Sequence, residues 1–230
     1  MRRLLREQSL SLAFFGLFVV SLAGQAYAGW HDYNNLETWH AQMAGEAPET
    51  LSLGRYLTSS SFAQAVTENW QSEYLQFTLF ILLTVWFIQK GSPESKQPGE
   101  EGRESDADQH VGEHVRPDSP RWAQAGGWRT RVYSNSLVLV MAGIWLWSWF
   151  AQSVSGWSEN NADRLEHEQS SLSWLGYLGS ADFWQTTLQN WQSEFLAVGS
   201  MAVLAIYLRQ RGSPESKPVG CPHHTTAAEG

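Results

Sequence analysis

Two long runs without a charged residue limit what this chain can fold into. Gln8–Trp30 contains no Asp, Glu, Lys or Arg over 23 residues, and Val132–Ser158 contains none over 27. A helix rises about 1.5 Å per residue, so either run can cross a hydrocarbon core of about 30 Å. The overall hydrophobic content of 43% hides these runs, because strongly polar segments lie between them. Both runs therefore predict membrane-spanning helices.

An internal repeat predicts two further helices of the same kind. The strings NWQSE and GSPESK each occur twice, 121 positions apart, beginning at Asn69 and Asn190 and at Gly91 and Gly212. Each pair of strings encloses an apolar segment, and Gly29-Trp30 aligns with Gly156-Trp157 so that the first charge-free run lies over the second. Each half thus contains an outgoing and a returning helix, and two crossings per half orient both copies in the same sense.

The sequence therefore predicts an all-α, polytopic membrane protein. It has four transmembrane helices, arranged as two parallel two-helix repeats with short extracytoplasmic helices. Residues 1–92 form the first repeat, with membrane helices at 8–29 and 71–90, and residues 131–218 form the second, with helices at 132–152 and 191–210. Ser59–Ser61 and Ser180 are predicted helix N-caps before the returning helices.

Two segments are predicted to be disordered. The linker 93–130 is mixed in charge and rich in Gly, Pro and Ser, without a usable apolar face, and the tail 219–230 is similar.

The N-terminus also fits a secretory signal, with Ala26-Tyr27-Ala28 resembling a cleavage site. The first apolar run aligns with residues 137–150, which lie too deep in the chain to be a signal peptide. We therefore expect an uncleaved first membrane helix, and N-terminal sequencing of the mature protein distinguishes the two cases.

Basic residues predict the orientation. Of the 15 Lys and Arg residues, all but Arg55 and Arg164 lie in the N-terminal segment, the linker or the C-terminal segment. The positive-inside rule then makes both termini cytoplasmic, in the inner membrane of a bacterium. The two loops on the outer side are acidic, which disfavours nucleic acid as a partner.

GSPESK has two interpretations, a cytoplasmic helix stop or a docking element. Gly suits the left-handed position after a helix, and the adjacent Lys90 and Arg211 can interact with its last carbonyls. A generic stop does not require six identical residues, whereas docking onto another part of the chain or onto a partner does. The residues concerned are Gly91, Ser92, Pro93 and Glu94, with Gly212, Ser213, Pro214 and Glu215.

NWQSE lies where each returning helix enters the membrane. Its Asn and Glu are four residues apart and share a helix face, so pseudo-twofold packing would bring two such sets together. Two interpretations remain open, a polar clamp that hydrogen-bonds the returning helices and a carboxylate pair that holds a proton, a cation or a cationic ligand. The polar cluster comprises Asn69, Gln71, Ser72 and Glu73, with Asn190, Gln192, Ser193 and Glu194.

No catalytic, metal or cofactor site is predicted. The chain has no Walker loop, no dinucleotide fingerprint and no Gly-x-Ser-x-Gly element. Histidines at His110–His114 and at His223-His224 lie in the polar segments without a second set of ligands. We therefore expect no enzyme.

The combination of NWQSE(F/Y)L with Q(K/R)GSPESK resembles a family of small bacterial integral-membrane proteins that is defined as a domain of unknown function. The resemblance covers residues 7–97 and 131–218 and implies an inner-membrane protein without an assigned activity or cofactor. We expect a non-enzymatic structural or interaction protein. Its partners would be the lipid bilayer and a membrane or cytoplasmic protein, or further copies of itself. The alternative is a permeation or sensing protein that uses Glu73 and Glu194.

Overall fold

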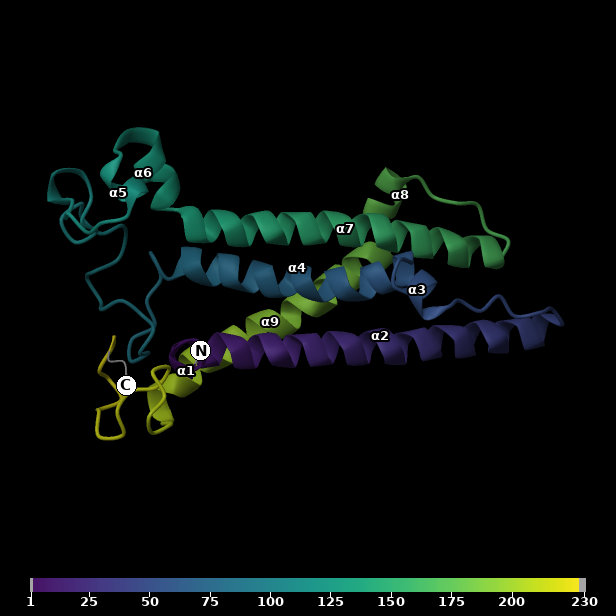
Figure 1. Cartoon of the computed structure of the whole chain (residues 1–230), viewed down its shortest axis with the longest axis horizontal. Coiled ribbons are helices and arrows are strands. Elements are labelled where there is room, and N and C mark those ends of the chain that lie inside the picture. Colours follow the sequence, from purple (N-terminus) through teal and green to yellow (C-terminus); the bar gives the residue numbers. More distant parts are fainter. Residues whose placement is uncertain (1, 228–230) are drawn as a thin grey trace. The chain divides into compact units, whose positions relative to one another are not determined.

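The computed structural model describes residues 2–227, so residues 228–230 of the predicted tail lie outside it. Within that range the chain is all-helical, without a strand (Figure 1). In chain order the elements are α1 (Arg2–Glu7), α2 (Ser9–Ala44), α3 (Leu53–Tyr56), α4 (Ser60–Leu83), the 3₁₀ helix η1 (Gly112–His114), α5 (Arg121–Gln124), α6 (Gly127–Tyr133), α7 (Ser136–Glu166), α8 (Trp174–Leu178) and α9 (Ala181–Tyr207).

Two of the described helices, α2 and α7, are long and apolar enough to cross a membrane. They carry the two charge-free runs, and Figure 1 shows each as one unbroken helix. No residue of the most apolar stretch of α2 is buried, and only 17% of that of α7 is buried.

The helices extend beyond the spans that hydrophobicity predicts. α2 continues to Ala44 and α7 to Glu166, past the predicted ends at residues 29 and 152. Hydrophobicity marks only the part of a helix suited to lipid, whereas polar residues continue the same backbone hydrogen bonding. α4 and α9 likewise begin before the predicted residues 71 and 191, and they end earlier than the predicted residues 90 and 210.

Matched serine caps begin the two returning helices. The backbone N–H of Phe62 donates to Ser59 Oγ at 3.2 Å, and that of Phe183 donates to Ser180 Oγ at 3.3 Å. The predicted caps at Ser59 and Ser180 are thereby confirmed. α4 and α9 each continue from their cap as one unbroken helix. The short helices α3 and α8 precede these caps.

The contacts divide the chain into two compact units that do not follow the two repeats. One unit contains the chain up to Val66 together with Val154–Leu172, and the other contains Thr67–Ser153 with the chain from Ser173 onward. Each unit therefore contains residues of both halves, and α7 contributes to both units.

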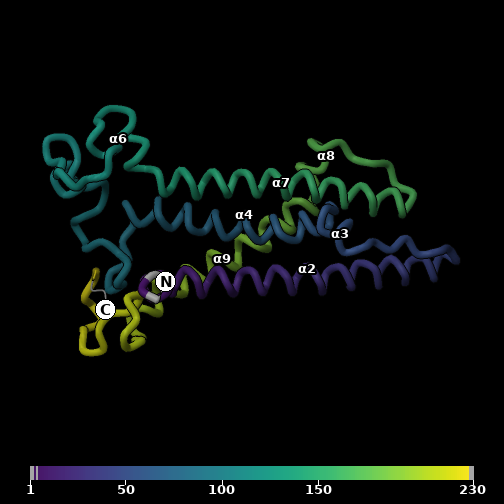
Figure 2. Tube along the Cα trace, in the orientation of Figure 1, coloured from purple at the N-terminus to yellow at the C-terminus, as the bar shows by residue number. Residues whose placement is uncertain are grey.

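In the first unit, the chain beyond α2 folds back along that helix as an extended segment (Figure 2). Trp30 Nε1 and Asn34 Nδ2 donate to the carbonyl of Leu51 at 2.6 and 2.9 Å. The N–H of Leu51 donates in return to Asn34 Oδ1 at 2.7 Å. The Asn amide thus satisfies both backbone groups of one residue, as a neighbouring strand would.

The second half forms the same clamp on α7. Trp157 Nε1 and Asn161 Nδ2 donate to the carbonyl of Leu172 at 2.8 and 3.0 Å, and the N–H of Leu172 donates to Asn161 Oδ1 at 2.8 Å. We call each set, Trp30–Asn34–Leu51 and Trp157–Asn161–Leu172, a Trp–Asn clamp.

Tyr56 packs beneath the first clamp. Its side chain is buried, with ring contacts to Tyr33 at 5.9 Å and to Phe62 at 5.5 Å. A Cβ atom at Gly29 would collide with the Tyr56 hydroxyl, so this close approach requires glycine. Burial, reinforced by nearby acidic side chains, raises the pKa of Tyr56 above its ordinary value, which keeps the phenol neutral.

The parts of the two halves that carry the Trp–Asn clamps also contact each other in this unit. The Ser60 hydroxyl at the start of α4 donates to the Glu159 carboxylate on α7. His40 Nδ1 on α2 lies 3.1 Å from Glu166 Oε1 at the end of α7. Polar contacts therefore join the halves at this end of the helices.

Where the sequence predicts a disordered linker, the structure contains turns and short helices held by local bonds. Ser105 Oγ donates to Asp108 Oδ2 at 2.6 Å, and Gln124 Nε2 donates to the Ser119 carbonyl at 2.6 Å. Thr130 Oγ1 donates to the Trp122 carbonyl at 2.8 Å, which joins α5 to α6. Composition averages over the segment and does not register such side-chain capping.

The clamps lead to a stability prediction. Asn34→Ala leaves both backbone groups of Leu51 without their amide partner, and we expect a loss of about 1–3 kcal/mol in the free energy of unfolding. Asn161→Ala should have a similar effect, because Leu172 is held in the same way. The readout is unfolding of the purified protein in mild detergent. The exposed neighbour Asn35 is the control, and Asn35→Ala should change stability by less than about 0.5 kcal/mol. Equal effects at Asn34 and Asn35 would contradict the clamp.

Candidate functional site

The two NWQSE strings lie within α4 and α9 and touch each other in the second unit. Trp191 Nε1, from the second string, donates to Gln71 Oε1, from the first, at 2.6 Å. Gln71 is 0% exposed, and its amide nitrogen donates to the carbonyl of Glu68 at 3.1 Å. The two copies are therefore joined by a hydrogen bond between a buried amide and an indole.

The two strings differ in burial although their local geometry is the same. Each serine bonds back to its own helix, with Ser72 Oγ donating to the Asn69 carbonyl at 2.9 Å and Ser193 Oγ to the Asn190 carbonyl at 2.8 Å. Gln71 and Ser72 are buried, whereas their counterparts Gln192 and Ser193 are exposed. The two sets of polar side chains therefore differ in burial, although their sequences are identical.

The two glutamates of the strings lie at the edge of this contact. Glu73 is exposed and Glu194 is half-buried, and Glu73 is close enough to act electrostatically on Glu194. The amide nitrogen of Asn190 turns back to the Thr186 carbonyl at 2.9 Å. The carboxylates thus share one region of the second unit, with one open and one partly covered.

A tryptophan cluster extends the contact from α9 to α7. The Trp149 ring lies 5.6 Å from that of Trp191 and 5.9 Å from that of Trp145, with which it is stacked. Trp149 also packs against Phe183 and donates to the hydroxyl of the fully buried Thr187 at 3.5 Å. One connected set of side chains therefore links α4, α9 and α7.

Buried polar atoms without a hydrogen-bond partner occur on α7 and α4, two of the helices that this cluster links. Among the described residues, Trp145 Nε1 and Ser148 Oγ on α7 and Gln76 Oε1 on α4 are buried without a hydrogen bond. Trp145 and Ser148 are three residues apart and share one face of α7. Buried polar groups are usually satisfied, so such atoms indicate strain, bound water or function.

Tyr177, which corresponds to Tyr56, is buried in the second unit. It packs against Phe183 at 5.6 Å and hydrogen-bonds to Asp182. Burial, together with the negative charge and hydrogen bond of Asp182, raises the pKa of Tyr177 well above its ordinary value. The phenol therefore stays neutral and serves as a structural hydrogen-bond donor.

The two GSPESK strings fold into the same turn, which we call the GSPESK turn. In the first copy the N–H of Gln89 donates to Ser95 Oγ at 2.9 Å, and the N–H of Glu94 donates to Ser92 Oγ at 3.4 Å. The second copy forms both bonds at the corresponding residues, from Gln210 to Ser216 at 2.9 Å and from Glu215 to Ser213 at 3.2 Å. Gly91 and Gly212 have φ values of 91° and 85°, which only glycine adopts readily.

These turns are not helix stops, in contrast to the first interpretation. α4 ends at Leu83 and α9 at Tyr207, well before the two glycines. Thr84 Oγ1 donates to the Phe80 carbonyl at 2.8 Å at the end of α4. Arg209 donates to the Ile206 and Leu208 carbonyls at 3.0 and 2.7 Å at the end of α9. Side chains nearer than Lys90 and Arg211 therefore complete the last turns.

The first GSPESK turn binds the C-terminal tail. Gly91 N–H donates to Thr226 Oγ1 at 2.9 Å, and Ala227 N–H donates to the Ser92 carbonyl at 3.1 Å. With the tail in place, Gly91, Ser92 and Pro93 are buried. Their counterparts are more open, with Gly212 and Pro214 exposed. The first string is therefore in contact with the C-terminal tail, while docking as the purpose of the repeated strings stays a prediction.

Lys217 joins the second string to the first. Its ammonium is buried and donates to the carbonyls of Gly91, His223 and Thr225 at 2.6, 2.9 and 3.2 Å. Burial lowers the pKa of Lys217 from its ordinary value, and the nearby Arg209 acts in the same direction. The corresponding Lys96 instead pairs with Glu104 at 3.0 Å. The last residue of the repeated string therefore has different partners in the two halves.

Sequence reasoning missed the Trp–Asn clamps and the role of Lys217. The clamp had a signal, because an Asn follows each Trp of the aligned Gly-Trp pairs by four residues, at Asn34 and Asn161. Lys217 had none, since its carbonyl partners are main-chain atoms that no side-chain pattern marks.

Comparison with known proteins assigns the chain to a family. The model of the family described as Domain of unknown function (DUF6766) matches residues 1–228, so the chain belongs to that family. No curated protein and no solved structure matches the chain.

The contact between the strings leads to a second prediction. Trp191→Phe leaves Gln71 Oε1 buried without its donor, and we expect a loss of about 1–3 kcal/mol in unfolding free energy. Gln71→Leu should also destabilise, and the double variant should lose less than the sum of the two. Interhelical hydrogen bonds in membranes couple by about 0.6 kcal/mol on average and up to about 1.7.

The repeat supplies the control for this cycle. Gln192, the counterpart of Gln71, is exposed, so Gln192→Leu should change stability by less than about 0.5 kcal/mol. All variants are unfolded in mixed micelles. Strict additivity of Trp191→Phe and Gln71→Leu would show that the hydrogen bond contributes nothing.

Proposed function

We propose that this member of the DUF6766 family is a non-enzymatic structural or interaction protein of the bacterial inner membrane. α2, α4, α7 and α9 would form four transmembrane helices in two parallel repeats, with both termini cytoplasmic. The observation that carries the proposal is the hydrogen bond from Trp191 to the buried Gln71. It supports the polar clamp between the two NWQSE strings, because polar side chains of the two copies bind each other.

The exposed apolar surface of α2 supports the membrane part. Between Leu10 and Val20, eight large apolar side chains are at least 41% exposed. Burial of each would stabilise the protein by about 1.5–3 kcal/mol. Together this is comparable with the whole stability of a domain, about 5–15 kcal/mol. A bilayer removes this surface from water.

α7 adds independent support, because it fits neither common alternative to a membrane helix. Its apolar stretch is too exposed for the core of a soluble protein, and it begins at Ser136, far from an N-terminal signal. α4 and α9 are 24 and 27 residues long, which corresponds to about 36 and 40 Å of helix. Their exposed apolar residues, such as Phe77 and Leu196, suit lipid.

If the polar clamp between the NWQSE strings holds the helices together, the outer faces of the helices remain available to bind other molecules. These faces would meet lipid and either a partner protein or a second copy of the chain. Crosslinking in native membranes followed by purification identifies which of these is present.

The alternative is a small permeation or sensing protein that uses Glu73 and Glu194. Two observations favour it, the electrostatic proximity of these carboxylates and the buried polar atoms of Trp145 and Ser148. Polar groups within membrane helices often mark ion or proton pathways.

Cysteine labelling tests the topology. In a Cys221→Ser background, Glu49→Cys lies between α2 and α3 and Glu101→Cys lies in the linker, both at exposed positions. We expect a membrane-impermeant maleimide to label Glu49→Cys in intact spheroplasts and Glu101→Cys only after permeabilisation. Labelling of both in intact spheroplasts, or of the linker alone, would contradict the proposed arrangement.

The double variant Glu73→Gln, Glu194→Gln distinguishes the polar clamp between the NWQSE strings from a carboxylate site that binds a proton or a cation. Gln retains hydrogen bonding, so a clamp should keep its unfolding midpoint and show no ion-dependent change in stability. The protein in liposomes is assayed for proton and monovalent cation flux, with Glu159→Gln as the control. Suppose that the parent protein shows an ion flux, that the double variant abolishes it and that Glu159→Gln preserves it. This result would contradict the polar clamp and support a permeation or sensing protein that uses Glu73 and Glu194.

A further inference from the structure

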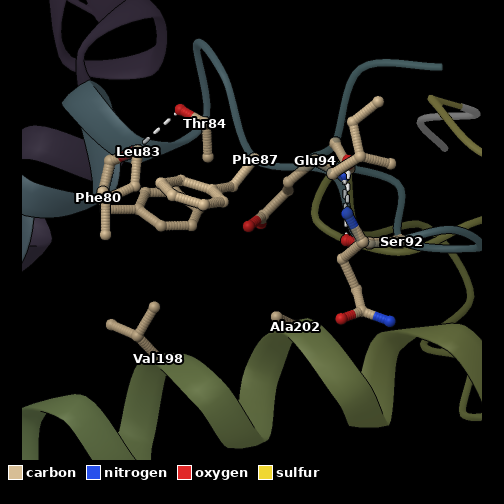
Figure 3. A pocket seen from close by; sticks show the side chains of 11 residues that line it. Phe80, Leu83, Thr84, Phe87, Ser92, Glu94, Val198 and Ala202 are labelled. Carbon is tan, nitrogen blue, oxygen red and sulfur yellow. Dashed lines mark hydrogen bonds between the residues drawn. The ribbon is translucent and has the colours of Figure 1, made fainter. Parts of the chain in front are cut away.

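A cavity of about 220 Å³ lies between the end of α4, the first GSPESK turn and α9 (Figure 3). Much of its wall is apolar, with Phe80, Leu83 and Phe87 on one side and Val198 and Ala202 on the other. Polar residues of the turn and of the end of α4 complete the lining. Val198 and Ala202 are four residues apart, so they share one face of α9. The cavity is smaller than the 300–1,000 Å³ or so that is typical of drug-sized ligands. It suits a small group.

One charged side chain lines this cavity. Glu94 belongs to the first GSPESK turn, and Figure 3 shows its carboxylate directed from the turn toward the space beside Phe87. The neighbouring lining residues Ser92 and Ser95 accept the backbone N–H groups of Glu94 and Gln89. These bonds hold the backbone of the turn from which the Glu94 side chain extends. An ionised carboxylate can accept several hydrogen bonds at once.

The carboxylate and the apolar side chains that line the cavity favour a cationic ligand with alkyl groups. A carboxylate attracts a cation, and the faces of Phe80 and Phe87 attract one as well, as in sites for quaternary ammonium groups. The aliphatic walls favour alkyl substituents, while an anion would be repelled by Glu94. Phe87 and Leu83 are also 68% and 45% exposed, so the apolar wall continues onto the surface. A ligand with an alkyl tail would cover that surface.

We propose that this cavity binds the substituted ammonium group of a cationic amphiphile, with Glu94 against the charge and the alkyl chain along Phe87 and Leu83. The site is distinct from the Glu73 and Glu194 pair. It rests on the proposed membrane location only in that the tail would lie among lipid chains.

The repeat shows that the site belongs to one half. The positions of Phe80 and Phe87 are occupied by Met201 and Leu208 in the second half, while Glu215 corresponds to Glu94. Glu215 is exposed and does not line the cavity. The second half therefore keeps the carboxylate but lacks both aromatic walls.

The test is a calorimetric titration of the full-length protein in maltoside micelles, which contain no ammonium group. The probe is decyltrimethylammonium, and the controls are decyl sulfate and tetramethylammonium. We expect the probe to bind the parent protein and each control to bind at least about tenfold more weakly. Loss of one favourable charge or ring contact corresponds to about a tenfold change.

Matched variants locate the binding. Glu94→Gln should weaken binding of the probe about tenfold, whereas Glu215→Gln should leave it unchanged. The pair Phe80→Met with Phe87→Leu, copied from the second half, should also weaken it. Ala202→Phe should block the cavity without changing the charge. An unchanged unfolding midpoint in each variant separates loss of binding from loss of structure.

Three results would overturn the proposal. They are unchanged binding by Glu94→Gln, equal binding of decyl sulfate, and equally tight binding of tetramethylammonium, which would make the tail irrelevant. Because micelles have no sidedness, this titration and the cysteine labelling fail independently of each other.

Discussion

The pairing of an asparagine side chain with the backbone of one leucine determines where each returning segment begins. Leu51 and Leu172 lie on extended segments, whose N–H and C=O groups need partners wherever water is scarce. Asn34 and Asn161 supply both partners, and Trp30 and Trp157 add a second donor. The halves differ by six residues in length. The difference lies between the Asn and the Leu of each clamp, since Leu51 follows Asn34 by 17 positions and Leu172 follows Asn161 by 11. Helix positions before the clamp and after it can therefore correspond in both copies.

Local geometry repeats in this protein, but burial does not. The GSPESK turns form the same bonds in both copies because those bonds depend on residues within six positions of each other. Burial depends on what covers the turn. The tail beyond Lys217 lies on the first copy, and Gln71 lies beneath Trp191, so the first copy of each string is the more buried one. A duplicated sequence has thus acquired different roles for its two copies through contacts distant in the chain.

The tryptophan cluster shows how the halves became specialised. Trp149 and Trp145 of α7 correspond to Leu22 and Phe18 of α2, so only the second half can form this stack. Indole rings offer a large apolar area and one donor, and such donors bind Gln71 and Thr187 here. The cluster therefore joins α7 to α9, and α9 to α4, by specific contacts.

The sequence by itself determined the helical class, the two long apolar helices, the repeat and the serine caps at Ser59 and Ser180. Each of these depends on composition or on spacing within one helical turn. It left open whether the NWQSE strings would meet, because that depended on how the two halves pack. Only the tertiary structure decided that Trp191 contacts Gln71, that Lys217 binds main-chain carbonyls, and that Glu94 lines a cavity. These contacts join residues up to 126 positions apart. Their partners are main-chain groups or members of another helix, and no local pattern selects them.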